Sequence, residues 1–129
     1  MKKCSVDIKD DDVLTEVYRQ TANMAKQRGD ADAVATSDDV DLLEGFIADG
    51  KALLMRGFGR YATEDMQYEM PENWLDAKKS VTELSTFYVV NYVLKRWYEQ
   101  NGTGERFEKT ANEALQGIIQ LLNKRMKPI

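Results

Sequence analysis

The fold of this 129-residue chain depends most on an uncharged segment, LSTFYVVNYVL, that runs from Leu84 to Leu94. A helix over this segment carries apolar side chains on nearly every side, which is typical of a helix surrounded by other helices. The helical pattern continues in both directions, so the sequence predicts a helix over about 74–100. With 11 residues, the uncharged segment is too short to cross a bilayer, which takes roughly 18 or more.

Three further helices are predicted from apolar spacing and from residues that favour helix ends. One covers about 11–28, where a run of aspartates complements the positive end of the helix dipole. The second covers about 38–58, and Thr36 with Asp39 has the spacing of a capping box at its start. The last covers about 105–125. Because only a short loop separates it from the long helix, the two should lie antiparallel and side by side.

Two short stretches, near 4–8 and 65–70, alternate apolar and polar residues with the period of a half-buried strand. They are too far apart for a tight hairpin, but they can pair once the intervening helices fold back. Because two isolated strands are marginally stable in water, the ribbon must lie on the helices. The predicted fold is therefore mainly α: one four-helix bundle-like domain over 1–129, with a small two-stranded β-ribbon.

The composition limits the chemistry that the protein can perform. The chain has no His and a single cysteine, Cys4. His-based acid–base catalysis, the common zinc ligand sets and an intrachain disulfide are therefore excluded, and paired carboxylates on the helices lack the His that bundle di-metal sites use. We predict that the protein is not an enzyme and has no catalytic, cofactor-binding or metal-binding residues. An enzyme that uses carboxylates, Lys and Tyr is the weakest alternative.

Two local motifs resemble ligand sites, and a structural role is favoured for both. Residues 57–62, GFGRYA, match a relaxed dinucleotide pattern, but a helix precedes the glycines where that site needs a strand. These glycines should instead end the second helix. The acidic residues from Asp30 to Asp41 resemble a calcium loop, but Val34 and Ala35 occupy positions that need an oxygen ligand and a glycine.

The charge distribution favours protein partners over nucleic acid. The net charge is −4, with the acidic excess in residues 1–69 and no basic stripe of the kind that a nucleic-acid binder shows. Lys2 and Lys3 are not followed by an apolar stretch, so no export signal is recognised. We expect no contact with nucleic acid or membrane, and a cytoplasmic location.

Candidate functional positions lie on the last two predicted helices. Asn91 is polar within the most apolar stretch, so it must find a hydrogen-bond partner inside the bundle or across a subunit contact. The aromatic residues of the long helix are interpreted as core, and Phe87→Ala or Trp97→Ala should cost about 3–5 kcal/mol. The candidates for core or interface are Phe87, Asn91, Trp97, Tyr98, Glu99, Leu121, Leu122 and Arg125.

Three motifs resemble those of head-tail connector proteins, which form a ring beneath the portal of tailed phages and prophages and adapt it to the tail. They are MPEN at 70–73, KRWYE at 95–99 and LLNKR at 121–125, and the resemblance covers chiefly 74–127. In the connector family, similar blocks end the long core helix and the last helix. The positions that correspond are Trp97, Tyr98, Glu99, Leu121, Leu122 and Arg125.

This resemblance implies a non-enzymatic structural protein of a phage or prophage that acts through protein–protein assembly. It implies portal or tail proteins as partners and a homo-oligomeric ring as one arrangement. The protein would then be found in the bacterial cytoplasm and afterwards in the virion. The alternative is a helical adaptor or regulatory module of a bacterial host that binds a protein or peptide in a groove beside the long helix. That alternative predicts a contiguous exposed apolar patch.

Overall fold

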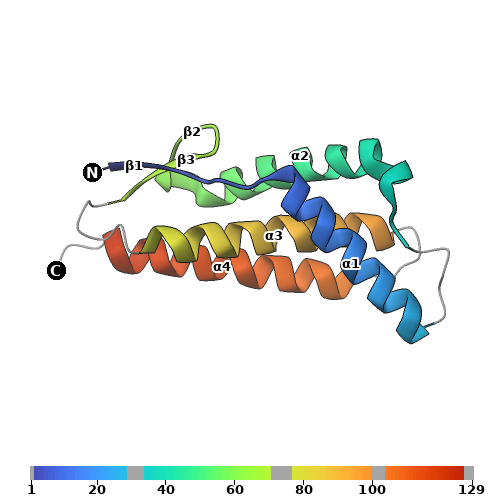
Figure 1. The fold of residues 1–129 in the computed structure, drawn as a ribbon. Helices are drawn as coiled ribbons and strands as arrows, with labels where there is room; N and C mark the ends of the chain where they lie inside the picture. Colours follow the sequence, from blue (N-terminus) through green and yellow to red (C-terminus); the bar gives the residue numbers. More distant parts are fainter. Residues whose placement is uncertain (1, 29–33, 71–76, 100–103, 127–129) are drawn as a thin grey trace.

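The computed structural model describes residues 2–28, 34–70, 77–99 and 104–126 (Figure 1). Over these residues the predicted mainly helical, bundle-like fold is confirmed. The helices are α1 (Asp10–Arg28), α2 (Val40–Phe58), α3 (Lys78–Tyr98) and α4 (Glu105–Met126), with short 3-10 helices η2 (Ser37–Asp39) and η3 (Gly59–Tyr61) on either side of α2. The strands are β1 (Lys2–Ser5), β2 (Ala62–Glu64) and β3 (Gln67–Met70).

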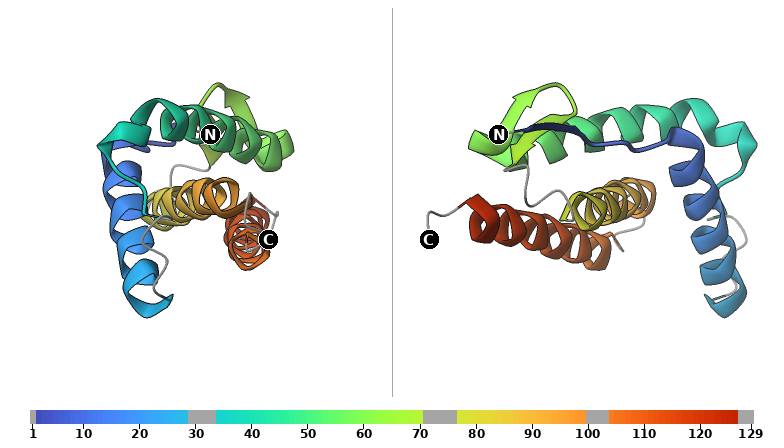
Figure 2. Two further views of the ribbon diagram at one scale, coloured as in Figure 1. Left: turned by 90° about the vertical axis from the view of Figure 1, so that its right-hand side faces the viewer. Right: turned by 60° about the vertical axis from the view of Figure 1, so that its left-hand side comes forward.

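Helix α3 lies at the centre of the molecule. It runs antiparallel beside α4, as predicted, packs against α2 on another side, and is crossed at an angle by α1 over its C-terminal half (Figures 1 and 2). Every residue from Tyr88 to Leu94 is buried. The prediction that neighbouring helices surround this segment is therefore confirmed.

The prediction that Phe87 belongs to the core is wrong, because 48% of its surface is exposed. Ser80 and Glu83 lie two turns and one turn before it along the same side of α3, and both are exposed. Leu94, two turns further on along that side, is fully buried. Phe87 thus lies where α3 has no helix covering this side.

The predicted helix ends are largely reproduced. Thr36 and Asp39 form the capping box, in which the Asp39 carboxylate accepts a 2.9 Å hydrogen bond from the Thr36 N–H, although a 3-10 turn precedes the start of α2 at Val40. Gly59 ends α2 with a φ of 55°, a conformation that glycine adopts at little cost, which confirms the role predicted for this motif. The predicted start of the long helix at 74 lies outside the described residues.

The sheet has three antiparallel strands in the order β1-β3-β2, not the predicted two. The predicted long-range pairing is confirmed, since Cys4 lies opposite Tyr68, but the paired part of the first strand is 2–5 and not 4–8. Strand β2, which forms a hairpin with β3, was not predicted because Ala62–Glu64 has no apolar alternation. The ring of Tyr68 packs edge-on against Phe58, with centroids 5.5 Å apart, and so joins the sheet to α2.

The link into α4 brings two backbones into close contact, which gives a test of the α3–α4 packing. A Cβ at Gly104 would lie 2.7 Å from the carbonyl oxygen of Lys95, whereas nothing lies within 4 Å of one at Gly45 on the outer side of α2. Gly104→Ala should therefore destabilise the fold by about 1–3 kcal/mol through overpacking. Gly45→Ala should stabilise it by about 0.5–1 kcal/mol, because alanine favours the helix more than glycine does. Urea unfolding followed by circular dichroism measures both changes, and equal stabilities would contradict the contact.

Candidate interaction surface

Three of the candidate residues belong to the core of the bundle. Asn91 is 4% exposed, and its amide nitrogen donates a 2.8 Å hydrogen bond to the carbonyl oxygen of Phe87, one turn earlier in α3. The partner that this buried amide requires thus lies inside the chain. Tyr98 is buried and stacks on Phe107 of α4, with ring centroids 5.4 Å apart, and Leu122 is fully buried.

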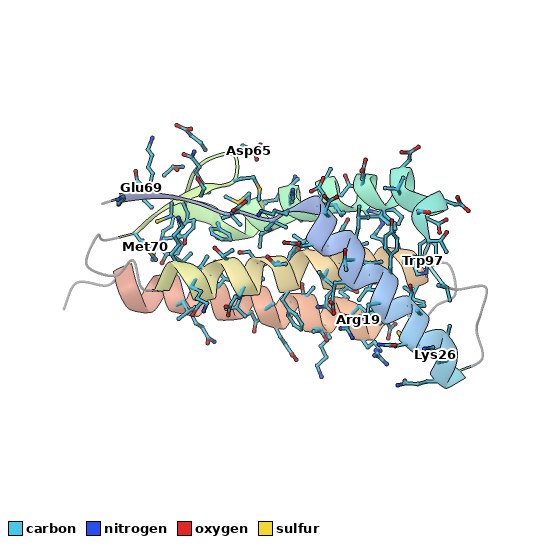
Figure 3. The ribbon with its side chains drawn as sticks, in the orientation of Figure 1. Arg19, Lys26, Asp65, Glu69, Met70 and Trp97 are labelled. Carbon is cyan, nitrogen blue, oxygen red and sulfur yellow. The ribbon has the colours of Figure 1, made fainter. Side chains whose placement is uncertain are left out.

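The remaining candidates lie nearer the surface. Trp97 and Leu121 are partly buried and pack against the core. Figure 3 shows Trp97 towards the C-terminal end of α3, at the opposite end of the molecule from Met70 of β3. Glu99 is exposed, and its carboxylate lies 3.6 Å from the Nε atom of Arg96. Arg125 lies in α4, but its side chain is outside the described part of the structure.

Phe87 adjoins an apolar contact that α3 and α4 form together. Leu84, one turn before it, is partly buried and packs over Gly117, where a Cβ would lie 3.5 Å from its Cδ1 atom. Leu121, also partly buried, follows Gly117 by one turn on the same side of α4. We call Leu84, Phe87, Gly117 and Leu121 the Phe87 surface. Leu42, on the first turn of α2, is also 48% exposed but lies on a different helix.

The charged end of α3 is held to α2 by Arg96, a contact that the sequence analysis missed. Its guanidinium lies 4.6 Å from the centroid of the Phe46 ring and donates hydrogen bonds to the Tyr92 hydroxyl at 2.8 Å and the Asp49 carboxylate at 3.3 Å. The hydrogen bond to Tyr92 contributes most to raising the pKa of Arg96, and Asp49 adds to it. These contacts position the C-terminal turn of α3, which includes Trp97.

A second polar cluster joins the glycine turn after α2 to α4. The hydroxyl of Tyr61 donates a hydrogen bond to the amide oxygen of Asn123, and Arg60 donates to that hydroxyl at 2.9 Å. Asn123 belongs to the LLNKR motif near the end of α4. The turn and the motif are thus in direct contact.

The described side chains show little that resembles a ligand site. Among them, His, Cys, Asp and Glu do not gather in groups of three or more that could hold a metal ion. Asp30, the first position of the calcium-like pattern, lies outside the described residues. A shallow polar depression follows α4 and is lined by Glu105, Glu108, Lys109, Asn112, Glu113 and Gln116. All of these residues belong to one helix, so the depression is an open surface and not a cleft between elements.

In the part of the chain that the structure describes, no helix combines the length and the apolar character that crossing a membrane requires. Comparison with models of protein families, with curated proteins and with solved structures finds no match to this chain. The resemblance to connector proteins therefore depends on the sequence motifs alone.

The exposure of Phe87 predicts a small effect on stability. Phe87→Ala should lower the free energy of unfolding by less than about 1 kcal/mol, because much of the ring is already in water. The matched substitution at a fully buried position of the same helix, Leu94→Ala, should cost about 2–5 kcal/mol. Chemical unfolding of the two variants measures the difference. A loss at Phe87 as large as that at Leu94 would place the ring in the core.

Buried tyrosines make the stability fall at alkaline pH. Burial raises the pKa of Tyr68 and of Tyr88 above the ordinary value of 10.0, with smaller contributions from Cys4 and Tyr92 respectively. The unfolded chain therefore loses these protons at a lower pH than the folded chain, so the contribution of the two tyrosines to the free energy of unfolding should be constant below about pH 10 and should decrease above it. Urea titrations at several pH values measure this. The free energy of unfolding of Tyr68→Phe should decrease less steeply above about pH 10 than that of the native protein, and an equally steep decrease would contradict the raised pKa of Tyr68.

Proposed function

We propose that this protein is a non-enzymatic structural protein that acts by assembling with other proteins, in the manner of the head-tail connectors that it resembles. The main support is the Phe87 surface. In α3, the residues from Tyr88 to Leu94 are all buried, yet the large aromatic ring directly before them is 48% exposed beside the partly exposed Leu84. Apolar side chains grouped on a surface are typical of protein–protein contacts.

The placement of the connector-like motifs also supports this proposal. KRWYE ends α3, and LLNKR lies near the end of α4. Because the two helices are antiparallel, the motifs lie at opposite ends of the bundle (Figure 1). A helix of this length spans about 30 Å. This arrangement suits a protein that contacts one neighbour at each end.

Exposed charges along the bundle are consistent with contacts at its two ends. Asp38, Asp41 and Glu44 surround the start of α2, whereas Lys78 and Lys79 lie at the start of α3, at the other end of the molecule (Figure 1). The end at which α2 begins also carries exposed Arg106 and Lys109 of α4, so charges of both signs are exposed there for contact with a neighbour (Figure 1). A homo-oligomeric ring, or a stack on a portal protein, would use such surfaces.

Co-purification tests the proposal. The chain should be expressed together with the portal protein encoded nearest to its gene, and one protein should retain the other at low salt, where attraction between charges is strongest. Phe87→Asp should reduce the retained portal protein by about tenfold or more, because it places a charge in an apolar contact. Leu42→Asp is the matched control on α2 and should leave retention unchanged.

Absence of retention at low salt, or equal loss with both variants, would contradict the connector proposal. If Phe87→Asp instead abolishes binding to an identified host protein while the portal protein is never retained, the adaptor function is favoured. The same surface would then be the groove-side contact beside α3.

A further inference from the structure

The extended segment from Lys2 to Ile8, which we call the strap, connects the sheet to the start of α1 (Figure 1). Alternate side chains of the strap point into the core: Cys4, Val6 and Ile8 are 3%, 4% and 7% exposed. Ser5 and Asp7, between them, are exposed. Three inward-facing side chains therefore fix the strap to the rest of the molecule.

The backbone of the strap is bonded on one side only. Val6 donates a 2.7 Å hydrogen bond to the carbonyl of Met66, which continues the register in which Cys4 lies opposite Tyr68. Since hydrogen-bonded pairs alternate along an antiparallel ladder, the N–H and C=O groups of Lys3 and Ser5 point away from β3. In the order β1-β3-β2, the strap is an edge strand whose backbone pairs with β3 alone, while the exposed side chain of Lys3 forms an ion pair with Glu64 of β2 at 3.3 Å.

The packing beneath the strap contains a poorly satisfied polar group. The Tyr68 side chain is fully buried, and its hydroxyl makes no well-formed hydrogen bond among the described residues. Burial raises the pKa of the phenol, and the thiol of Cys4, a weak hydrogen-bonding group on the paired residue of β1, adds to the shift. A buried hydroxyl with no stronger partner than a thiol destabilises the closed strap, and opening of the strap would let water reach it. The closed strap is thus less stable than its apolar contacts alone would make it.

We propose that the strap opens as a unit and that the site vacated on β3 accepts the strap of a second copy of this chain. The vacated site fits the strap of a second copy, because a strap of the same sequence fills it within one copy. The edge of β3 would pair with the backbone of the incoming strap, and the core of the receiving copy would bury its Cys4, Val6 and Ile8. Exchange of an identical element between copies needs no new contact. This inference rests on the proposed function in assembly, since it names a contact through which copies join.

The opening step can be measured with the native protein, because Cys4 is its only cysteine. A thiol reagent such as dithiobis-nitrobenzoate should label Cys4 far faster than global unfolding allows, with little dependence on urea at low concentrations. Tyr68→Phe removes the poorly satisfied hydroxyl and should slow labelling by about tenfold.

Ile118→Val is the control for this measurement, because it weakens the buried core at α4 and leaves the residues of the strap and of β3 unchanged. It should leave the labelling rate without urea unchanged. If the labelling rate of Cys4 in Ile118→Val instead rises by the factor that the loss in its free energy of unfolding predicts, Cys4 is exposed only by complete unfolding. That result would overturn the proposal.

The exchange step can be tested with a disulfide between copies. Ser5 lies opposite Gln67 as a non-hydrogen-bonded pair, a geometry in which the two Cα atoms are close enough for a disulfide. One copy carries Ser5→Cys and the other Gln67→Cys, both with Cys4→Ala, and the copies are mixed at high concentration under mild oxidation. Strand exchange predicts a disulfide-linked heterodimer on a non-reducing gel, with the 5–67 bond identified by mass spectrometry.

The control pairs Ser5→Cys with Glu83→Cys on the exposed side of α3, which measures cross-linking by random collision. Heterodimer formation no greater than in this control would overturn strand exchange. Retention of the portal protein depends on the Phe87 surface and not on the strap. If the protein retains the portal protein but does not exchange strands, the connector proposal stands and the strand-exchange inference fails. If it exchanges strands but does not retain the portal protein, the connector proposal fails and the strand-exchange inference stands.

Discussion

Burial of α3 on several sides is the constraint that organises this molecule. A helix whose residues from Tyr88 to Leu94 are all buried must be enclosed by other elements of the chain, and α1, α2 and α4 provide that enclosure. The enclosure also determines how polar groups are satisfied. Asn91 bonds to the backbone of its own helix, and Tyr92 places its hydroxyl next to Arg96 at the bundle edge. Both groups are thus paired with a residue about one turn away along the same helix.

Most of the fold could be predicted from local patterns. The helices follow from apolar spacing, and the capping box at Thr36 and the ending of α2 at Gly59 follow from residue types with known preferences. The pairing of β1 with β3 could also be predicted, because both strands alternate apolar and polar residues. Strand β2 could not, since it is three residues long and has no alternation of apolar and polar residues.

The candidate surface was harder to predict, because periodicity gives the side of a helix on which a residue lies but not where a neighbouring helix stops covering it. Phe87 and Leu94 share one side of α3, yet the first is half exposed and the second is buried. Exposed Ser80 and Glu83 on that side are the signal that could have identified Phe87 as a surface residue. The contacts of Arg96 with Asp49 and Phe46 join positions 47 or more residues apart in sequence, which no local pattern contains.

The antiparallel arrangement of α3 and α4 has a mechanical consequence. Two helices packed along most of their length resist bending and compression, so a protein that contacts a neighbour at each end would hold those neighbours at a fixed separation. The two helices together would act as a spacer whose length is set by the number of helical turns. Removing seven residues, about two turns, from each helix would shorten that spacer by about 10.5 Å and would rotate the two contact sites relative to each other by only about 20°.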